Sequence, residues 1–261
     1  MQLIERIRQT IQKIKIQHID NIHSLPVNKN DYISVEKAIT LNLGNNAQFT
    51  LMCTPNNIKK LAVGFLYTQG IIKNIEDIEK FSQHKNIVNV VLKSPQIYDH
   101  NFIKSSSGGT FNTIFEKLIL PPTLFIDYQI LFVVMQEIQR QQKLFKITGG
   151  THAAAIFLSG GKIIACCEDI GRHNALDKVI GECLLTKKNF TGCGVALSGR
   201  VSLEMVNKAA KAGIEIIASV SAPSSLAIQM AEKYNITLCG FVRNEKANIY
   251  SHPIRLIFKP K

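Results

Sequence analysis

Three turns in the second half of the chain gather hydroxyl, glycine and charged residues. The stretch CCEDIGRHNALDK contains Glu168, Asp169, Arg172, His173, Asn174 and Asp177; ALSGRVS contains Ser198, Gly199, Arg200 and Ser202; VSAPSS contains Ser221, Pro223, Ser224 and Ser225. Glycine lets a backbone approach a phosphate, a following helix aims free amide groups at it, and arginine adds a bidentate contact. Helix capping by Ser202 or Ser224 is the simpler interpretation of any single turn. Three turns together favour a site for a phosphate-bearing ligand.

Two histidines are the best candidates for side-chain chemistry, because imidazole titrates near neutral pH. His152 follows TGGT, and His173 lies next to Asp169 and Arg172. A histidine beside a turn is more often a hydrogen-bonded structural residue, and His173 is the stronger of the two candidates. The spacing supports no Ser-His-Asp triad, and GGTH lacks the lysine of a phosphate-binding loop. We take His173 and Asp169 as the candidate catalytic residues.

Alternating strands and helices must position these turns. A helix is expected around 127–144, then a strand pair hinged on Gly160 and Gly161, and strand, turn and helix units follow to the end. This order predicts a largely parallel sheet covered by helices, which binds ligands at the carboxyl ends of its strands. We expect one domain over residues 124–261, with the three turns at one edge of its sheet.

A smaller α/β lobe is predicted over residues 25–100. A hairpin that turns at Gly44 is indicated by the segment ISVEKAITLNLGNNAQFTLMCTP. A helix capped by Asn56 or Asn57 is indicated by the segment NNIKKLAVGFLYTQGII. The run NIVNVVL adds a strand at 86–92.

An irregular segment, residues 101–123, separates the two parts. It contains KSSSGGTFN at 104–112 and is closed by Pro121 and Pro122. A connection this long inside a compact chain is either functional or mobile. Its glycines supply freedom to move, so we predict a mobile gate or delivery arm over the ligand.

Charge favours an anionic partner. The net charge is +12 and the pI is near 9.4. The lysines are scattered, and only 7% of residues are aromatic, with no tryptophan. Because nucleic-acid platforms interleave aromatic and basic residues, this composition favours a phosphate-bearing small ligand and argues against nucleic acid.

The pattern of residues 1–24 predicts a basic amphipathic helix. The apolar residues at helical spacing are Leu3, Ile4, Ile7, Ile11 and Ile14. Docking on its own protein or on a second subunit is a better explanation than binding at a membrane surface. The segment lacks the features of a secretory signal, and no apolar run in the chain is long enough to span a membrane.

The six cysteines contain no pair at C-x-x-C spacing. Neither a zinc site nor a local redox pair is expected, and free thiols in a reducing cytoplasm are the simplest interpretation.

Several long motifs occur in the order of one known family. They are LMCTPNNIKKLAVGFLYTQGII, TGGTHAAA, EDIGRHNALDKVIG, SGRVSLEMVNKAAKAGI, SAPSSLAI, GFVR and IYSHPIRL. From about residue 30 to the end, the chain resembles the FdhD/NarQ family of formate dehydrogenase accessory proteins. The resemblance implies a cytoplasmic homodimer with a cytidine-deaminase-like, three-layer α/β core and a smaller N-terminal lobe. The zinc signatures of the deaminases are absent, so neither deaminase chemistry nor zinc is expected.

Members of that family take sulfur from a cysteine desulfurase and pass it to the molybdenum cofactor, bis-molybdopterin guanine dinucleotide (bis-MGD), for formate dehydrogenase. The resemblance implies that bis-MGD, or a guanine nucleotide as its mimic, binds the turns. The implied contacts are Thr148, Gly149, Gly150, Thr151, His152, Gly171, Arg172, Asn174, Ser198, Gly199, Arg200, Ser202, Ser221, Ala222, Pro223, Ser224, Ser225, Phe241, Val242, Arg243, Asn244, Glu245 and Lys246.

The loop at 104–112 departs from the family pattern. In the family it typically reads S-S-C-G-x-C-G, and its first cysteine carries the persulfide, whereas Ser107 and Thr110 occupy the two cysteine positions here. A hydroxyl cannot exchange sulfane sulfur as a thiolate does. Three explanations are open: Cys166 or Cys167 carries the sulfur, the protein binds the cofactor without sulfuration, or the cysteines were replaced in this chain. The leading hypothesis is a cofactor-binding sulfurtransferase; the alternative is a non-catalytic carrier of the cofactor or of a guanine nucleotide.

Overall fold

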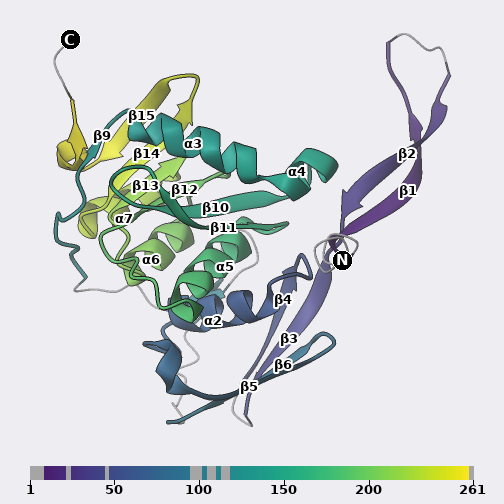
Figure 1. Cartoon of the computed structure of the whole chain (residues 1–261), viewed down its shortest axis with the longest axis horizontal. Coiled ribbons are helices and arrows are strands. Elements are labelled where there is room, and N and C mark those ends of the chain that lie inside the picture. Colours follow the sequence, from purple (N-terminus) through teal and green to yellow (C-terminus); the bar gives the residue numbers. More distant parts are fainter. Residues whose placement is uncertain are drawn as a thin grey trace.

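A six-stranded sheet forms the centre of the larger lobe in the computed structural model, which describes residues 9–21, 25–44, 47–94, 102–104, 110–112 and 118–258. The strand order is β11-β10-β12-β13-β14-β15 (Figure 1). The strands are β10 (His152–Phe157), β11 (Ile163–Asp169), β12 (Gly194–Leu197), β13 (Ile216–Ser219), β14 (Thr237–Arg243) and β15 (Lys246–Ser251).

The directions of these strands correct the expectation of a largely parallel sheet. Strands β12, β13 and β14 are parallel, but β10 is antiparallel to both of its neighbours and β15 is antiparallel to β14. The reason is loop length, because the short turns around Gly160 and at 244–245 join only antiparallel strands. The sheet is therefore mixed, with a parallel centre.

Helices cover both faces of the sheet. Helix α3 (Ile130–Gln141) packs on one face, while α5 (Arg172–Leu185), α6 (Leu203–Lys211) and α7 (Ser225–Lys233) pack on the other. Strand β10 is buried from Ala153 to Phe157, because alternate side chains enter the two separate cores. The expected helix at 127–144 is interrupted at Gln142, after which α4 (Lys143–Thr148) begins. The larger lobe thus has three layers.

The smaller lobe confirms the predicted hairpin, helix and strand, but Asn57 at the start of the helix makes no side-chain capping bond, contrary to expectation. Its sheet has the order β4-β3-β6-β5, from β3 (Lys37–Leu43), β4 (Ala47–Cys53), β5 (Ile78–His84) and β6 (Ile87–Leu92), and one short 3-10 turn, η1 (Ile75–Asp77), precedes β5. Helix α2 (Ile58–Thr68) packs between this sheet and α5. At the crossing, a Cβ atom on Gly64 would lie 1.8 Å from the Asp177 carbonyl oxygen, and one on Gly181 would lie 1.9 Å from that of Lys60. The two glycines let the lobes join through directly touching helix backbones.

Residues 11–18 correct the expectation of a helix over residues 1–24, while residues 1–8 and 22–24 lie outside the described residues. Residues 9–10 are helical, but Ile11–His18 form strand β1, which pairs antiparallel with β2 (Val27–Ser34). The spacing of Ile11 and Ile14 fits a helix, yet Ile14, Ile16 and His18 alternate along a β-branched segment, and pairing with β2 favours the strand. Figure 1 shows the two strands projecting from the rest of the molecule.

Short elements complete the described chain. They are β7 (Phe102–Lys104), β8 (Thr110–Asn112), β9 (Ile126–Asp127), η2 (Pro253–Arg255) and β16 (Leu256–Ile257). Strand β16 pairs with β9, and the fully buried Arg255 donates through Nε to Glu215 Oε2 at 2.9 Å. Glu215 also accepts hydrogen bonds from the backbone amides of Thr123 and Leu124, so one carboxylate fastens both segments to the sheet.

No helix within the described ranges is both long enough and apolar enough to cross a lipid bilayer.

Candidate functional site

The predicted turns lie together at one edge of the large sheet. His152 opens β10 directly opposite Asp169 at the end of β11, and Leu197 at the end of β12 pairs with Ser219 at the end of β13. Because β10 runs antiparallel to β12, the start of β10 reaches the edge where β12 and β13 end. The TGGTH turn therefore lies at the same edge of the sheet as the Ser-Gly-Arg and Ser-Ala-Pro turns.

Backbone hydrogen bonds fasten the second and third turns to each other. Val201 N donates to Ala222 O at 3.2 Å, and Ser224 N donates to Val201 O at 2.9 Å. The buried Ser219 hydroxyl donates to Gly199 O at 2.6 Å, and Ser224 caps α7 by accepting from Ala227 N. These contacts hold the two turns as one rigid unit.

A cationic cluster surrounds Gly199. A Cβ atom on this glycine would lie only 3.0 Å from His152 Nδ1 and 3.7 Å from Arg172 Cβ. Because glycine has no side chain, His152 and Arg172 can both pack closely against the backbone here. A pocket of ≈ 540 Å³ beside it is lined by Arg172, Arg200, Val201, Ser202, Ala222, Pro223 and Ser224. Arg172 Nε is buried and has no hydrogen-bond partner in the described part of the chain. The cluster is thus arranged to attract an anion.

The cations in this cluster repel one another. Burial lowers the pKa of Arg172, and the charge of Arg200 lowers it further. Burial also lowers the pKa of His152, with contributions from both arginines. A bound anion would relieve this repulsion, whereas His152 acts as a neutral imidazole without one.

A second pocket, of ≈ 530 Å³, adjoins the same edge. Its lining is Gln139, Gln142, Phe145, Lys146, Gly149, Gly150, Thr151, His152, Ser198 and Val220. Gly149 ends α4 in the left-handed conformation, with φ of 64°. The Glu168 carboxylate accepts from the amides of Leu144 and Phe145 and from the Thr151 hydroxyl, which fixes the TGGTH turn against α4. His152 lines this pocket and contacts the Gly199 turn, so it links the two sides of the site.

His173 lies against Ser202 and Glu204 and does not pair with Asp169, contrary to expectation. Its Nε2 lies 3.3 Å from Ser202 Oγ and 3.3 Å from Glu204 Oε2. Burial lowers the pKa of His173 to about 3, and the charges of Lys208 and Arg172 add to the shift. These effects outweigh the nearby carboxylate, so His173 is a neutral imidazole, and its Nε2 forms a hydrogen bond with Ser202 Oγ.

Asp169 has a structural role instead. It is fully buried, and Lys178 Nζ lies 2.5 Å from its Oδ2. Thr54 N donates to the same carboxylate, as do Gly171 N and the Asn174 side chain. Asn174 also donates to Met52 O, so the residue predicted to bind the cofactor connects the two lobes.

A buried charged network that was not predicted from the sequence lies behind His173. Lys208 lies 2.5 Å from Asp177 and 3.8 Å from Glu204, and Thr68 donates to Asp177 from the smaller lobe. Burial raises the pKa of Asp177, and Lys208 opposes that shift. The only signal in the sequence was the i,i+4 spacing of Glu204 and Lys208.

Several other predicted cofactor contacts lie elsewhere or serve the fold. The Val242 side chain is fully buried in the core beneath α3, so it faces away from the site. Phe241 N donates to Ser221 O, and Asn244 and Glu245 form the turn of the β14–β15 hairpin with positive φ. Thr148 Oγ1 lies 2.7 Å from Ser34 Oγ on β2. The exposed Arg243 and Lys246 flank the hairpin turn.

The six thiols are poor candidates for sulfur exchange. Five are buried and Cys166 is half-buried. Burial raises the pKa of Cys53, Cys166, Cys183 and Cys239 to about 12 and that of Cys193 to about 11, and it raises that of Cys167 still further. Nearby carboxylates add to the shift at Cys166 and Cys167. Because reactive cysteines have lowered pKa values, the structure does not favour a relocated sulfur carrier at either position.

The predicted persulfide loop is described only in part. Strands β7 and β8 pair antiparallel, with Lys104 opposite Thr110. Ser107 lies outside the described residues, so its predicted role stays a prediction.

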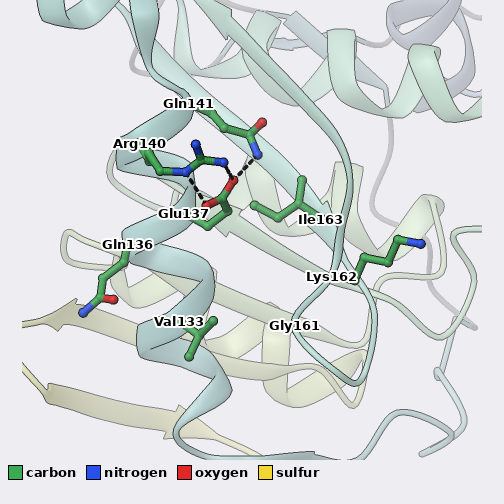
Figure 2. Close-up of a pocket in the computed structure, with 8 residues that line it drawn as sticks. All are labelled: Val133, Gln136, Glu137, Arg140, Gln141, Gly161, Lys162 and Ile163. Atoms are coloured by element: carbon green, nitrogen blue, oxygen red, sulfur yellow. Dashed lines mark hydrogen bonds and ion pairs between the residues drawn. The ribbon is translucent and has the colours of Figure 1, made fainter.

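Another pocket, of ≈ 490 Å³, lies apart from the predicted turns, between α3 and the β10–β11 turn (Figure 2). Glu137 there accepts from Arg140 and Gln141, and these hydrogen bonds lower its pKa to about 2. The lining of this pocket includes a carboxylate, Glu137, which pairs with Arg140, whereas the Gly199 pocket is lined by two arginines and no acidic residue, so the Gly199 pocket suits an anion better. The described ranges contain no cluster of three or more His, Cys, Asp or Glu side chains arranged to hold a metal ion.

Comparison with known proteins agrees with the motifs. The model of the FdhD/NarQ family matches residues 34–257. Relatives called sulfur carrier protein FdhD include one from Sulfolobus acidocaldarius, 36% identical over 94% of this chain and 98% of that protein, and one from Thermoplasma acidophilum, 41% identical over 87% of each. A crystal structure described as a formate dehydrogenase accessory protein from Desulfotalea psychrophila has a similar fold, with a TM-score of 0.81 and 23% identity over 95% of this chain and 100% of that one. On this evidence the chain belongs to the FdhD/NarQ family.

Proposed function

We propose that this chain is an accessory protein of formate dehydrogenase that binds the phosphate-bearing molybdenum cofactor at the Gly199 edge. The observation that carries the proposal is the convergence of Arg172, Arg200 and His152 around one glycine. The names of the relatives and of the similar structure support formate dehydrogenase as the target.

The residues at this edge fit the phosphate groups of a guanine dinucleotide such as bis-MGD, the cargo in this account. Arg172 has a buried, unpartnered Nε, and Arg200 lies on the neighbouring turn. The Ser202 and Ser224 turns begin α6 and α7, whose N-termini carry partial positive charge. These groups would bind and orient phosphates, and His152 and Gly149 would border the adjacent hollow. The same donors would bind GDP, which carries the phosphates and guanine of the cofactor and can serve as its mimic.

His173 has a positioning role in this proposal. With its Nε2 protonated, the neutral imidazole would donate to Ser202 Oγ at 3.3 Å. Ser202 makes no side-chain capping bond to α6, so its own proton is available to a bound phosphate. His173 would thus orient the hydroxyl without carrying charge.

The sulfur step is the part of the family function that this chain fits least well. The relatives are named sulfur carriers, but Ser107 and Thr110 replace the family cysteines and all six thiols have raised pKa values. We therefore favour a carrier that binds the cofactor without holding a persulfide itself.

The experiment is to incubate the protein with a cysteine desulfurase and cysteine, and to locate any persulfide by peptide mass spectrometry. We expect no adduct on the six native cysteines, while the same preparation binds GDP. The double variant Ser107→Cys, Thr110→Cys restores the family pattern and should gain the adduct at position 107. A persulfide on Cys166 or Cys167 would support sulfur transfer by a relocated thiol instead.

A further inference from the structure

The outer edge of β4 carries backbone groups that no described strand pairs with. Strand β4 lies at one end of the smaller sheet and pairs only with β3 among the described strands. Thr40 N donates to Asn86 O on the β6 side, so the opposed residues Thr40 and Thr50 share no backbone hydrogen bond. The N–H and C=O of Thr50 therefore point away from β3, as do those of Gln48 and Met52, two residues away on either side.

The two edges of this sheet differ in their protection against pairing with another chain. Strand β5, at the other edge, contains Glu79 and Lys80 and has an irregular register between Ile78 and Lys80. Charged side chains and bulges are common features that keep an edge strand from adding a further strand. Strand β4, AQFTLMC, contains no charged residue and no proline, and its register with β3 is regular. Of the two edges, β4 is the one suited to accept another strand.

A pocket of ≈ 670 Å³ runs along this edge of β4. Residues 48–52 all line it, and they alternate between exposed and half-buried positions, so the pocket borders the edge of the strand rather than one face. The opposite wall belongs to the larger lobe, where Asn174 of α5 donates to Met52 O at 2.7 Å. The outward backbone groups of Thr50 have no partner within the described ranges, so they are open to a ligand in this pocket.

The charge of this pocket is opposite to that of the whole protein. Its ionisable lining residues are Glu36, His173, Asp177, Glu204 and Lys208. His173 is neutral, so three carboxylates and one ammonium group leave a net charge of −2, whereas the chain carries +12. Lys208 lies 2.5 Å from Asp177, so the excess negative charge comes from Glu36 and Glu204. A basic side chain therefore complements the pocket.

We propose that the outer edge of β4 binds an extended segment of a protein partner, which adds a strand to the smaller sheet and places a lysine or arginine in the acidic pocket. Backbone hydrogen bonds to β4 supply affinity, and the basic side chain supplies specificity. The unpaired edge, its lack of protecting charges and the acidic wall carry this inference, which does not depend on the proposed cofactor site.

The test is fluorescence anisotropy of the full chain with a pair of labelled hexapeptides. Both peptides alternate threonine and valine, and one has a central lysine where the other has a glutamate. We expect the lysine peptide to bind with a Kd below about 1 mM and at least about tenfold more tightly than the glutamate peptide, because the pocket attracts one charge and repels the other.

Two variants separate the backbone contact from the charge. Thr50→Pro removes an outward N–H without breaking a bond to β3, so it should weaken binding of the lysine peptide about fivefold. Its matched control is Gln83→Pro on the outer edge of β5, which should leave binding unchanged; Gln83 pairs with Val88, whose backbone faces β3, so its N–H also points outward. Glu36→Lys should reduce the preference for the lysine peptide at least about threefold.

Failure of the lysine peptide to bind, or equal affinities for the two peptides, would overturn the proposal. A folded Thr50→Pro protein that binds like wild type would also overturn it. If Thr50→Pro does not fold, Glu36→Lys decides, since an unchanged preference would show that the acidic pocket does not read the peptide. A wild-type chain that is dimeric by sedimentation and becomes monomeric in Thr50→Pro would assign the edge to a second copy of this chain instead.

Discussion

Lys178 and Asp169 form an ion pair with no solvent exposure, and Nζ lies 2.5 Å from Oδ2. The lysine also donates to Thr54 O and to Asn56 Oδ1, so the pair sits where the smaller lobe meets the N-terminus of α5. The ion pair thus fixes the start of α5, which carries Arg172 and His173, against the smaller lobe.

Removing one member of this pair should be costly. Lys178→Met keeps the length of the side chain but leaves a buried carboxylate without its cation, and we expect a loss of about 3–5 kcal/mol in the free energy of unfolding. Urea denaturation measures it. The control is Lys60→Met, which breaks the more exposed pair with Glu182 and should cost less than about 1 kcal/mol. Equal losses of unfolding free energy in the two variants would show that the buried pair stabilises the contact between the lobes no more than an exposed pair does.

The contact between α2 and α5 should not tolerate a methyl group. In an exposed helix Gly→Ala gains up to about 1 kcal/mol, but at Gly64 the added Cβ would overlap the Asp177 carbonyl. We expect Gly64→Ala to lose about 1–3 kcal/mol by overpacking. Gly160→Ala, where the Cβ would meet open space, should be nearly neutral. A stabilised Gly64→Ala protein would contradict the close helix crossing.

Acid should destabilise the fold partly through His173. Its pKa falls from 6.5 to about 3 on folding, so between these values the unfolded chain binds a proton that the folded chain does not. Its contribution is therefore complete above pH 6.5 and is lost as the pH falls toward 3, with a slope of up to about 1.4 kcal/mol per pH unit. His173→Gln should flatten the fall in unfolding free energy below pH 6.5, and His84→Gln, at an exposed position, should not. Identical slopes for wild type and His173→Gln would refute the shift.

The native thiols should react slowly. With pKa values raised by burial, the thiolate fraction at pH 8 is very small, and we expect iodoacetamide to modify the folded protein negligibly within minutes. Half-buried Cys166 should react first. Protein unfolded in urea serves as the control and should take up six labels. Rapid labelling of a single native cysteine would identify a reactive thiol that the structure does not favour.

The sequence predicted the large lobe better than the details of its site. Long periodic segments and turn residues identified the order of strands and helices and brought the three turns to one edge. The residues next to Asp169 in the sequence indicated the wrong partner for it, because Lys178 lies two turns along α5 and another donor, Thr54 N, comes from the other lobe. Glu204 and Lys208 were missed for the same reason, since their partners His173 and Asp177 lie on a different helix.

The N-terminal error has another cause. The isoleucines of β1 fit both a helical and an alternating pattern, and pairing with the polar strand β2 decides between them. Tertiary partners of this kind cannot be read from local spacing.

The most direct test of the central claim is the affinity for GDP by isothermal titration calorimetry, with wild type, Arg200→Ala and Arg140→Ala compared. A charge-assisted contact contributes about 1.5–3 kcal/mol, so Arg200→Ala should weaken binding at least about tenfold. Arg140, an exposed arginine paired with Glu137 away from the turns, should have no effect when it is replaced. If Arg200→Ala binds GDP as tightly as wild type, the Gly199 edge is not the phosphate site.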